Sequence, residues 1–334
     1  MSTQQQRKEC TMNNSSLEST HEATPYTLAA KHRQQRQRMR RFKANLPLLI
    51  MFMPVILYFV VFKYAPMGGL IIAFKDYNFY DGILRSPWVG LHYFEMLFQD
   101  PRTLQIIRNT FVLSLMSIIF GFPVPIMLAI MLNEVRNMIF KRTVQTIVYM
   151  PHFLSWVIIA MMITTMFSLE NGIINNFVEM IFGEPYAFMY NSGSWVAVFI
   201  SSGIWKDMGF NAIIFLAALT TIDPSQYEAA SMDGASKARQ IWHITLPGIR
   251  STIILLLILS MGRVMEVGFD QVYMLQNSNV NDIADVISTY IYRVGLQGAQ
   301  FSLTTALGLF ESLVAFVLIV SANYIARKFN EGLW

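Results

Sequence analysis

Charged side chains stand inside stretches of this chain that are otherwise apolar: Lys206 and Asp207, then Arg263 and Glu266, and finally Glu311. Charges are costly in lipid, so such residues usually face a water-filled cavity or pair with one another. Lys206 and Asp207 lie about 18 Å along their stretch at ~1.5 Å per residue, near the middle of a bilayer. Two alternatives stay open: contact with a polar solute that crosses the membrane, or structural pairing, for example of Arg263 with Glu266 or Glu311.

Polar and aromatic residues near these charges have the chemistry of a sugar path: Trp205, Asn211, Asp270, Gln271 and Tyr273. Aromatic faces stack on the apolar side of pyranose rings, and amides or carboxylates pair with hydroxyl groups. Trp and Tyr also mark membrane interfaces, so an anchoring role is the alternative. Adjacent helical positions point about 100° apart, so Lys206 and Asp207 are not expected to line one narrow path equally.

The composition indicates an all-α integral membrane protein. Of 334 residues, 54% are hydrophobic and only 14% are charged, which is far from an ordinary soluble domain. The single cysteine, Cys10, excludes an intrachain disulfide and a cysteine metal cluster. The net charge of +4 comes from basic residues beside an apolar segment, as expected for a cytoplasmic membrane flank rather than for a nucleic-acid partner.

Two parts are predicted along the chain. Residues 1–44 form a disordered, basic cytoplasmic tail whose segment KHRQQRQRMRRFK precedes the first apolar run, which we interpret as an uncleaved anchor and not a signal peptide. Residues 45–334 form a domain of about six helical spans, each near the ~20 residues that cross a bilayer. The predicted spans are 46–62, 108–133, 144–168, 194–219, 251–269 and 302–325, with a polar loop at 220–250.

Loop charges predict the orientation. Lys and Arg gather in the loops after the second, fourth and sixth spans, whereas the loop between the third and fourth spans has none. Because cytoplasmic loops are enriched in Lys and Arg, both termini and the 220–250 loop are expected in the cytoplasm. The basic residues concerned are Arg136, Lys141, Arg142, Lys237, Arg239, Arg250, Arg327 and Lys328.

Several kinds of catalysis lack their motifs here. The sequence contains no Gly-x4-Gly-Lys-Ser/Thr phosphate loop, no Gly-x-Ser-x-Gly elbow and no His-Glu-x-x-His metal site. We therefore expect no catalytic residue, no metal site and no enzyme activity in this chain alone.

The polar loop itself predicts a helix, a hinge and a second helix. Asp223 can cap a helix that begins at Pro224, and Gly234 can end it in a left-handed conformation. A second short helix is expected from Ala235 to about His243, ended by Leu246 and Pro247.

The same loop resembles the Glu-Ala-Ala loop of the membrane subunits of bacterial ATP-binding cassette importers. Glu228-Ala229-Ala230, three residues, Gly234, nine residues, Ile244, one residue and Leu246-Pro247 match every position of that motif. The resemblance covers most of residues 45–334, and this part of the chain is similar to carbohydrate-uptake permeases of the maltose-permease type. The chain ending, Asn323-Tyr324 to Trp334, resembles the branch for complex oligosaccharides and polysaccharide fragments. Further matching segments are Trp88-Val89-Gly90-Leu91, Gly209-Phe210-Asn211 and Phe269-Asp270-Gln271-Val272-Tyr273.

The resemblance implies a permease subunit in a bacterial cytoplasmic membrane. The loop would be a coupling helix in a groove of a separate ATPase, with Glu228, Ala229, Ala230, Gly234, Ile244, Leu246 and Pro247 as coupling residues. It implies four kinds of partner: a second permease in a heterodimer, an ATPase homodimer that binds ATP and Mg, a lipoprotein-type extracytoplasmic binding protein, and an oligosaccharide.

Three alternatives stay open. The first is a transporter driven by an ion gradient, which the intramembrane charges alone support. The second is the same importer carrying a non-sugar polar solute such as glycerol phosphate. The third is a membrane scaffold or a lipid-linked glycosyltransferase, for which the sequence lacks a cluster of extramembrane carboxylates.

Overall fold

The computed structural model describes residues 45–328 and Gly332. Within this part the regular elements are helices, and one isolated bridge joins Lys75 and Trp88, so the predicted all-α architecture is confirmed. The tail 1–44, with Cys10, and most of the final segment lie outside the described residues. The chain divides into two compact units, Met1–Gly68 and Gly69–Trp334, which we describe separately.

The described part of the first unit is an apolar helix with exposed side chains. Residues 45–59 are α-helical, followed by a π-turn, η1 (Val60–Tyr64), and by α3 (Ala65–Met67). The Ala65 N–H bonds to the Val60 carbonyl, and the next residue, Pro66, has no N–H to donate. A proline ring also clashes with the carbonyl four residues earlier, so a widened turn lets the helix pass through the proline.

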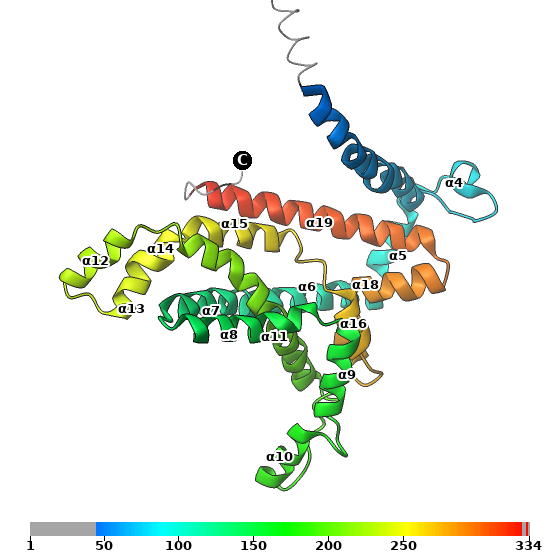
Figure 1. Cartoon of the computed structure of the whole chain (residues 1–334). Helices are drawn as coiled ribbons and strands as arrows, with labels where there is room; N and C mark the ends of the chain where they lie inside the picture. Colours follow the sequence, from blue (N-terminus) through cyan, green and yellow to red (C-terminus); the bar gives the residue numbers. More distant parts are fainter. Residues whose placement is uncertain (1–44, 329–331, 333–334) are drawn as a thin grey trace, which may run out of the picture. The chain divides into compact units, whose positions relative to one another are not determined.

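The second unit contains the remaining elements (Figure 1). They are η2 (Gly68–Phe74), α4 (Gly82–Arg85), α5 (His92–Gln99), α6 (Pro101–Gly121), α7 (Pro123–Glu134), α8 (Met138–Tyr149), η3 (Met150–Phe153), α9 (Trp156–Met166), α10 (Ile173–Phe182), α11 (Ser192–Leu219), α12 (Pro224–Met232), α13 (Lys237–Gln240), η4 (Ile241–Thr245), α14 (Leu246–Gly248), α15 (Arg250–Met261), α16 (Phe269–Leu275), α17 (Asn281–Ala284), α18 (Ile287–Tyr290), η5 (Ile291–Gln297) and α19 (Phe301–Arg327).

Three helices in the described part are long and apolar enough to cross a membrane: Asn45–Phe74, Pro101–Glu134 and Phe301–Arg327. The number rises to 6 if each of three bent helix pairs forms one span. The bent pairs are Met138–Phe153 with Trp156–Met166 at 102°, Ser192–Leu219 with Pro224–Met232 at 76°, and Lys237–Gly248 with Arg250–Met261 at 61°. Each of the six stretches predicted from sequence overlaps one of these helices or bent pairs, although the stretches 144–168 and 251–269 run past the helix ends.

Two of the predicted spans are not continuous helices. The stretch 144–168 breaks at η3, where Pro151 removes a backbone donor and Ser155 caps the new helix α9 through the Ile158 N–H. The stretch 251–269 ends as a helix at Met261, and residues 262–268 are non-helical. Glycines flank this second break, at Gly262 and Gly268, where the helix is weakest.

Helix α11 forms the centre of the second unit. It packs against α6, α7 and α8 (Figure 1), and its N-terminal half buries Trp195 and Phe199 against Val272 and Leu275. The Trp195 indole Nε1 donates a hydrogen bond to the Leu275 carbonyl at 2.9 Å. At Gly209 any added Cβ would collide with the Val148 carbonyl on α8, so glycine is what lets these two backbones touch.

Candidate functional site

A cavity of about 350 Å³ lies among α6, α7, α11, α15 and α16. Most of its lining is apolar, and its polar lining comes from helices distant in the sequence. Four of the ten residues predicted for a solute path meet here, namely Asp207, Asn211, Arg263 and Gln271. Ser117 and Ser260 add hydroxyl groups, and the sequence analysis missed both.

The geometry of α11 and α16 explains how these side chains meet. Asp207 and Asn211 are four residues apart and therefore share one face of α11. Gln271, in the first turn of α16, donates from Nε2 to the Phe199 carbonyl at 2.7 Å and to Ser202 Oγ at 3.3 Å. The amide packs next to Gly203, where an added Cβ would lie 3.4 Å from Gln271 Nε2, an ordinary contact.

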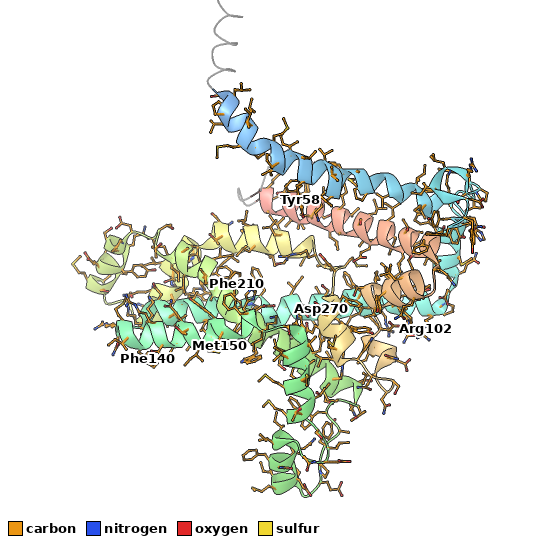
Figure 2. All side chains as sticks on the ribbon, turned by 45° about the vertical axis from the view of Figure 1, so that its right-hand side comes forward. Tyr58, Arg102, Phe140, Met150, Phe210 and Asp270 are labelled. Atoms are coloured by element: carbon orange, nitrogen blue, oxygen red, sulfur yellow. The ribbon has the colours of Figure 1, made fainter. Side chains whose placement is uncertain are left out.

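Asp207 has a partner that the sequence did not reveal. Its Oδ1 lies 2.8 Å from His152 Nδ1, and the His152 ring stacks on Phe210 with centroids 4.0 Å apart. Figure 2 labels Phe210 on α11 and Met150, the first residue of η3. A histidine after a proline carries no sequence signal for a contact 55 residues away, so local patterns do not predict this pairing.

Lys206 is not part of the cavity. Its side chain is buried, and Nζ donates to the carbonyls of Leu154 at 2.6 Å, His152 at 2.8 Å and Pro151 at 3.5 Å. These bonds satisfy all three ammonium donors. Lys206 therefore connects α11 to the break in the third span and, unlike the predicted path residue Asp207 next to it, does not line this cavity.

Arg263 lies in the non-helical segment 262–268 with its side chain accessible. The expected alternative, an ion pair with Glu266 or Glu311, is not what the structure shows: no carboxylate in the described part lies within 4.0 Å of its guanidinium nitrogens. Glu266 is exposed in the same segment and Glu311 is half-buried on α19. Neither lines the cavity.

The remaining predicted path residues also lie off the cavity lining. Trp205 is half-exposed on another face of α11. Tyr273 stacks on Phe269 with centroids 5.1 Å apart and meets the edge of Tyr292 at 5.4 Å. Asp270, labelled in Figure 2, is exposed at the start of α16. On α16, Gln271 thus lines the cavity, whereas Asp270 and Tyr273 lie on the other side of the helix.

The polar loop 220–250 contains the predicted helix and hinge. Asp223 accepts a hydrogen bond from the Ser225 N–H at 2.9 Å and caps α12, which begins at Pro224. That bond holds the pKa of the Asp223 carboxyl below its usual value. Gly234 has φ of +74°, the left-handed conformation that favours glycine, so the predicted hinge is present.

The second helix differs from the prediction. It begins at Lys237 and does not end at Leu246 and Pro247, but continues through both to Gly248 (Figure 1). The Leu246 N–H bonds to the Ile241 carbonyl in a π-turn placed two residues before Pro247, as happens before Pro66 in the first unit. The widened turn accommodates the proline and removes the expected stop.

Side chains hold the two loop helices together. Tyr227 Oη lies 3.0 Å from Thr245 Oγ1, and Gln240 Nε2 donates to Ser231 Oγ at 2.9 Å. Among the predicted coupling residues, the side chains of three are exposed and those of three are half-buried, while the remaining residue is the hinge glycine itself. The exposed ones are Glu228, Ala229 and Pro247, and the half-buried ones are Ala230, Ile244 and Leu246.

Glu228 lines an open groove of about 460 Å³ between this loop and the end of α7. Lys237 and Glu134 also line the groove and pair across it, with Nζ and Oε2 2.9 Å apart. The sequence analysis used Lys237 only as a loop charge and did not mention Glu134. The pair connects the loop directly to the second span.

No metal site stands beside these features: within the described residues, no three His, Cys, Asp or Glu side chains are grouped so as to hold an ion. The site consists of a mainly apolar cavity with a few polar groups, a charged groove and the loop that α11 connects to the cavity.

Comparison with known proteins gives a consistent result. A family model described as binding-protein-dependent transport system inner membrane component matches residues 121–333. Protein LplB of Bacillus subtilis is 45% identical over 89% of this chain and 93% of its own length. The polygalacturonan/rhamnogalacturonan transport system permease protein YteP of the same bacterium is 45% identical over 85% of this chain and 88% of its own.

Solved structures are similar over the same range. A bacterial ABC transporter involved in the import of the acidic polysaccharide alginate matches with a TM-score of 0.81 and 41% identity, covering 87% of this chain and 99% of that chain. A bacterial alginate ABC transporter in complex with an alginate pentasaccharide-bound periplasmic protein matches with the same TM-score over 88% of this chain and 98% of that chain.

Proposed function

Because this chain belongs to the binding-protein-dependent transport system inner membrane components, we propose that it forms half of the membrane pathway of an ATP-driven importer for an oligosaccharide or polysaccharide fragment. One observation carries the proposal. The helix that lines the polar cavity with Asp207 and Asn211 continues, after one short turn, into the loop with the Gly234 hinge. Displacement of the loop is thereby transmitted to the cavity.

The loop is the coupling element to a separate ATPase. Its first helix exposes Glu228 and Ala229 on the protein surface. The hinge and the side-chain hydrogen bonds make the two short helices one rigid body. A rigid element of this kind transmits a displacement instead of absorbing it. We assign ATP, Mg and hydrolysis to a pair of ATPase subunits, so this chain is the transport component and not the enzyme.

The pathway needs further partners. A second permease completes the membrane part as a heterodimer, and a lipoprotein-type binding protein delivers the saccharide from outside. The relatives named for polygalacturonan/rhamnogalacturonan and for alginate support a polysaccharide fragment as the cargo. Complex formation of the alginate transporter with a saccharide-bound periplasmic protein supports the mode of delivery.

The location follows from the family and the loop charges. The chain is a membrane permease, and we place it in the bacterial cytoplasmic membrane as the six-span domain 45–334. Lys237, Arg239 and Arg250 in the coupling loop support a cytoplasmic position for the loop and for both termini. The ATPase pair then lies on the side where ATP is available.

Within the cavity, neutral polar groups suit a saccharide. Asn211, Ser260 and Gln271 present amide and hydroxyl groups that pair with sugar hydroxyls. The apolar lining between them suits the C–H faces of a pyranose ring. We assign these residues to the cargo path, together with Asp207 and Arg263.

Reconstituted transport tests the proposal. Proteoliposomes with both permeases, the ATPase pair and a loaded binding protein should import an oligogalacturonate only when ATP is hydrolysed. E228A should reduce uptake about tenfold or more, because the loop then loses one charge-assisted hydrogen bond to the ATPase. G234V should uncouple the loop, because a non-glycine residue in a left-handed conformation costs about 1–2 kcal/mol. E179A on α10, an exposed glutamate outside the loop, is the matched control and should leave uptake unchanged.

Two results would contradict the proposal. Uptake that follows a proton or sodium gradient and ignores ATP would favour a secondary transporter. Normal ATP-driven uptake by both loop variants, with the ATPase still bound, would show that the loop is not the coupling element.

A further inference from the structure

One charged side chain in the cavity lining has no ion-pair partner among the described residues. Of its two charged lining residues, Asp207 is engaged by His152 at 2.8 Å. Arg263 has no carboxylate within 4.0 Å among the described residues. Lys206, the nearby second cation, is fully occupied by three carbonyls. Arg263 is thus the cation that the cavity offers to something from outside the chain.

The backbone at Arg263 is anchored on both sides. The two residues that follow it, Val264 and Met265, are 1% and 2% exposed and anchor the non-helical segment in the core. Backbone bonds close the turn on both sides, from the Arg263 N–H to the Ser260 carbonyl at 3.0 Å and from the Glu266 N–H to the Arg263 carbonyl at 2.9 Å. The break in the fifth span therefore fixes the Arg263 backbone, from which its side chain reaches the cavity lining.

The surroundings decide what the guanidinium binds. Its neighbours in the lining include Leu259 and Leu256, one and two turns back on α15, which offer the exposed guanidinium no hydrogen-bond acceptor in their side chains. A hydroxyl group would supply a hydrogen bond and leave the charge in place. A carboxylate supplies two parallel hydrogen bonds and also neutralises the charge, which is the pairing that the planar guanidinium favours.

Resting on the proposed function, we infer that Arg263 binds a carboxylate of the cargo, and that the transported saccharide is therefore an acidic one built from uronic acids. Asn211 and Ser260 face the same space and bind the hydroxyl groups of the sugar ring. Arg263 is the residue that distinguishes an acidic saccharide from its neutral counterpart of the same shape.

A binding measurement on the membrane part tests this without the selectivity of the binding protein. The permease heterodimer in nanodiscs is titrated with tetragalacturonate and with the same tetrasaccharide after its carboxyl groups are reduced to alcohols. Wild-type protein should bind the acidic probe at least about tenfold more tightly, the worth of one charge-assisted pair. R263Q should lose this preference while binding the neutral probe as before, and R263K should keep part of it.

A matched variant and the transport assay separate the outcomes. E266Q changes a charge in the same segment outside the cavity lining, and its preference should equal that of wild type. Equal wild-type binding of both probes, or an unchanged preference in R263Q, would overturn the inference. Loss of heterodimer stability in R263Q, with equal weakening of both probes, would overturn it too, because Arg263 would then pair with the second permease.

The proposed function fails in a different way. If ATP-driven uptake is normal but equally fast for the acidic and the neutral probe, only the inference about Arg263 fails. If neither saccharide binds and neither is imported under ATP hydrolysis, the proposed function fails, and the inference with it.

Discussion

Replacing Lys206 with methionine removes the three hydrogen bonds that join α11 to the break in the third span. Two are short, 2.6 Å to the Leu154 carbonyl and 2.8 Å to the His152 carbonyl, and each bond to a charged group contributes about 1.5–3 kcal/mol. The third, 3.5 Å to the Pro151 carbonyl, is long and adds little. Methionine has nearly the same length, so K206M removes the donors with little change in packing.

The net effect is smaller than the sum of these bonds. An ammonium that is 8% exposed costs free energy to bury, and methionine relieves that cost. The carbonyls left without donors lie at a 102° break where the helix cannot satisfy them. We expect K206M to destabilise the permease by about 2–4 kcal/mol, since stranded buried acceptors outweigh the relief.

Thermal unfolding of the purified complex in detergent measures this. K206M should lower the unfolding midpoint by roughly 4 °C or more, and uptake should fall in proportion to the folded complex, with the substrate KM unchanged. K237M is the matched control, because that lysine is 64% exposed and its loss should cost little. If K206M unfolded at the temperature of K237M, or if it raised KM at full stability, Lys206 would be a path residue and the reasoning would be refuted.

Three further predictions follow. G209A should destabilise the permease by about 1–3 kcal/mol, the usual cost of overpacking, because its Cβ would meet backbone of α8; thermal unfolding measures this. A double-mutant cycle on Glu134 and Lys237, 37% and 64% exposed, should give a coupling of only about 0.2–1 kcal/mol that vanishes in high salt. Burial and the hydrogen bond to Asp76 raise the pKa of Tyr93 from 10.0 to about 12. The folded state therefore keeps the phenol proton up to a higher pH than the unfolded state does. The stability that this contributes is complete below pH 10 and is lost as the pH rises through 12. The ultraviolet difference titration of wild type against Y93F should show this late ionisation.

Controls accompany these predictions. G121A, where the nearest atom to an added Cβ is 3.6 Å away, should be tolerated, and equal stability of G121A and G209A would contradict the close contact of α11 with α8. A salt-independent coupling of Glu134 to Lys237 would show a buried pair. D76N should move the Tyr93 ionisation toward pH 10, and no movement would show that Asp76 has no part in it.

Sequence alone determined the features that depend on a few neighbouring residues. Asp223 before Pro224 determines where α12 begins, because an N-cap and a first-turn proline act within one turn. Gly234 determines the hinge, because the left-handed conformation is a property of a single residue. The apolar stretches and the loop motif likewise gave the helical membrane architecture and the family.

Only the tertiary structure decided which polar groups share a cavity. Helix α11 is apolar on all sides, so its periodicity does not show that Asp207 faces the cavity and Lys206 does not. The partners of both residues come from η3 and from Leu154 directly after it, 52 to 55 residues away in the chain. Arg263 reaches the cavity because the helix stops at Met261, and the exact path of an interrupted span depends on the packing of its neighbours, which no local pattern contains.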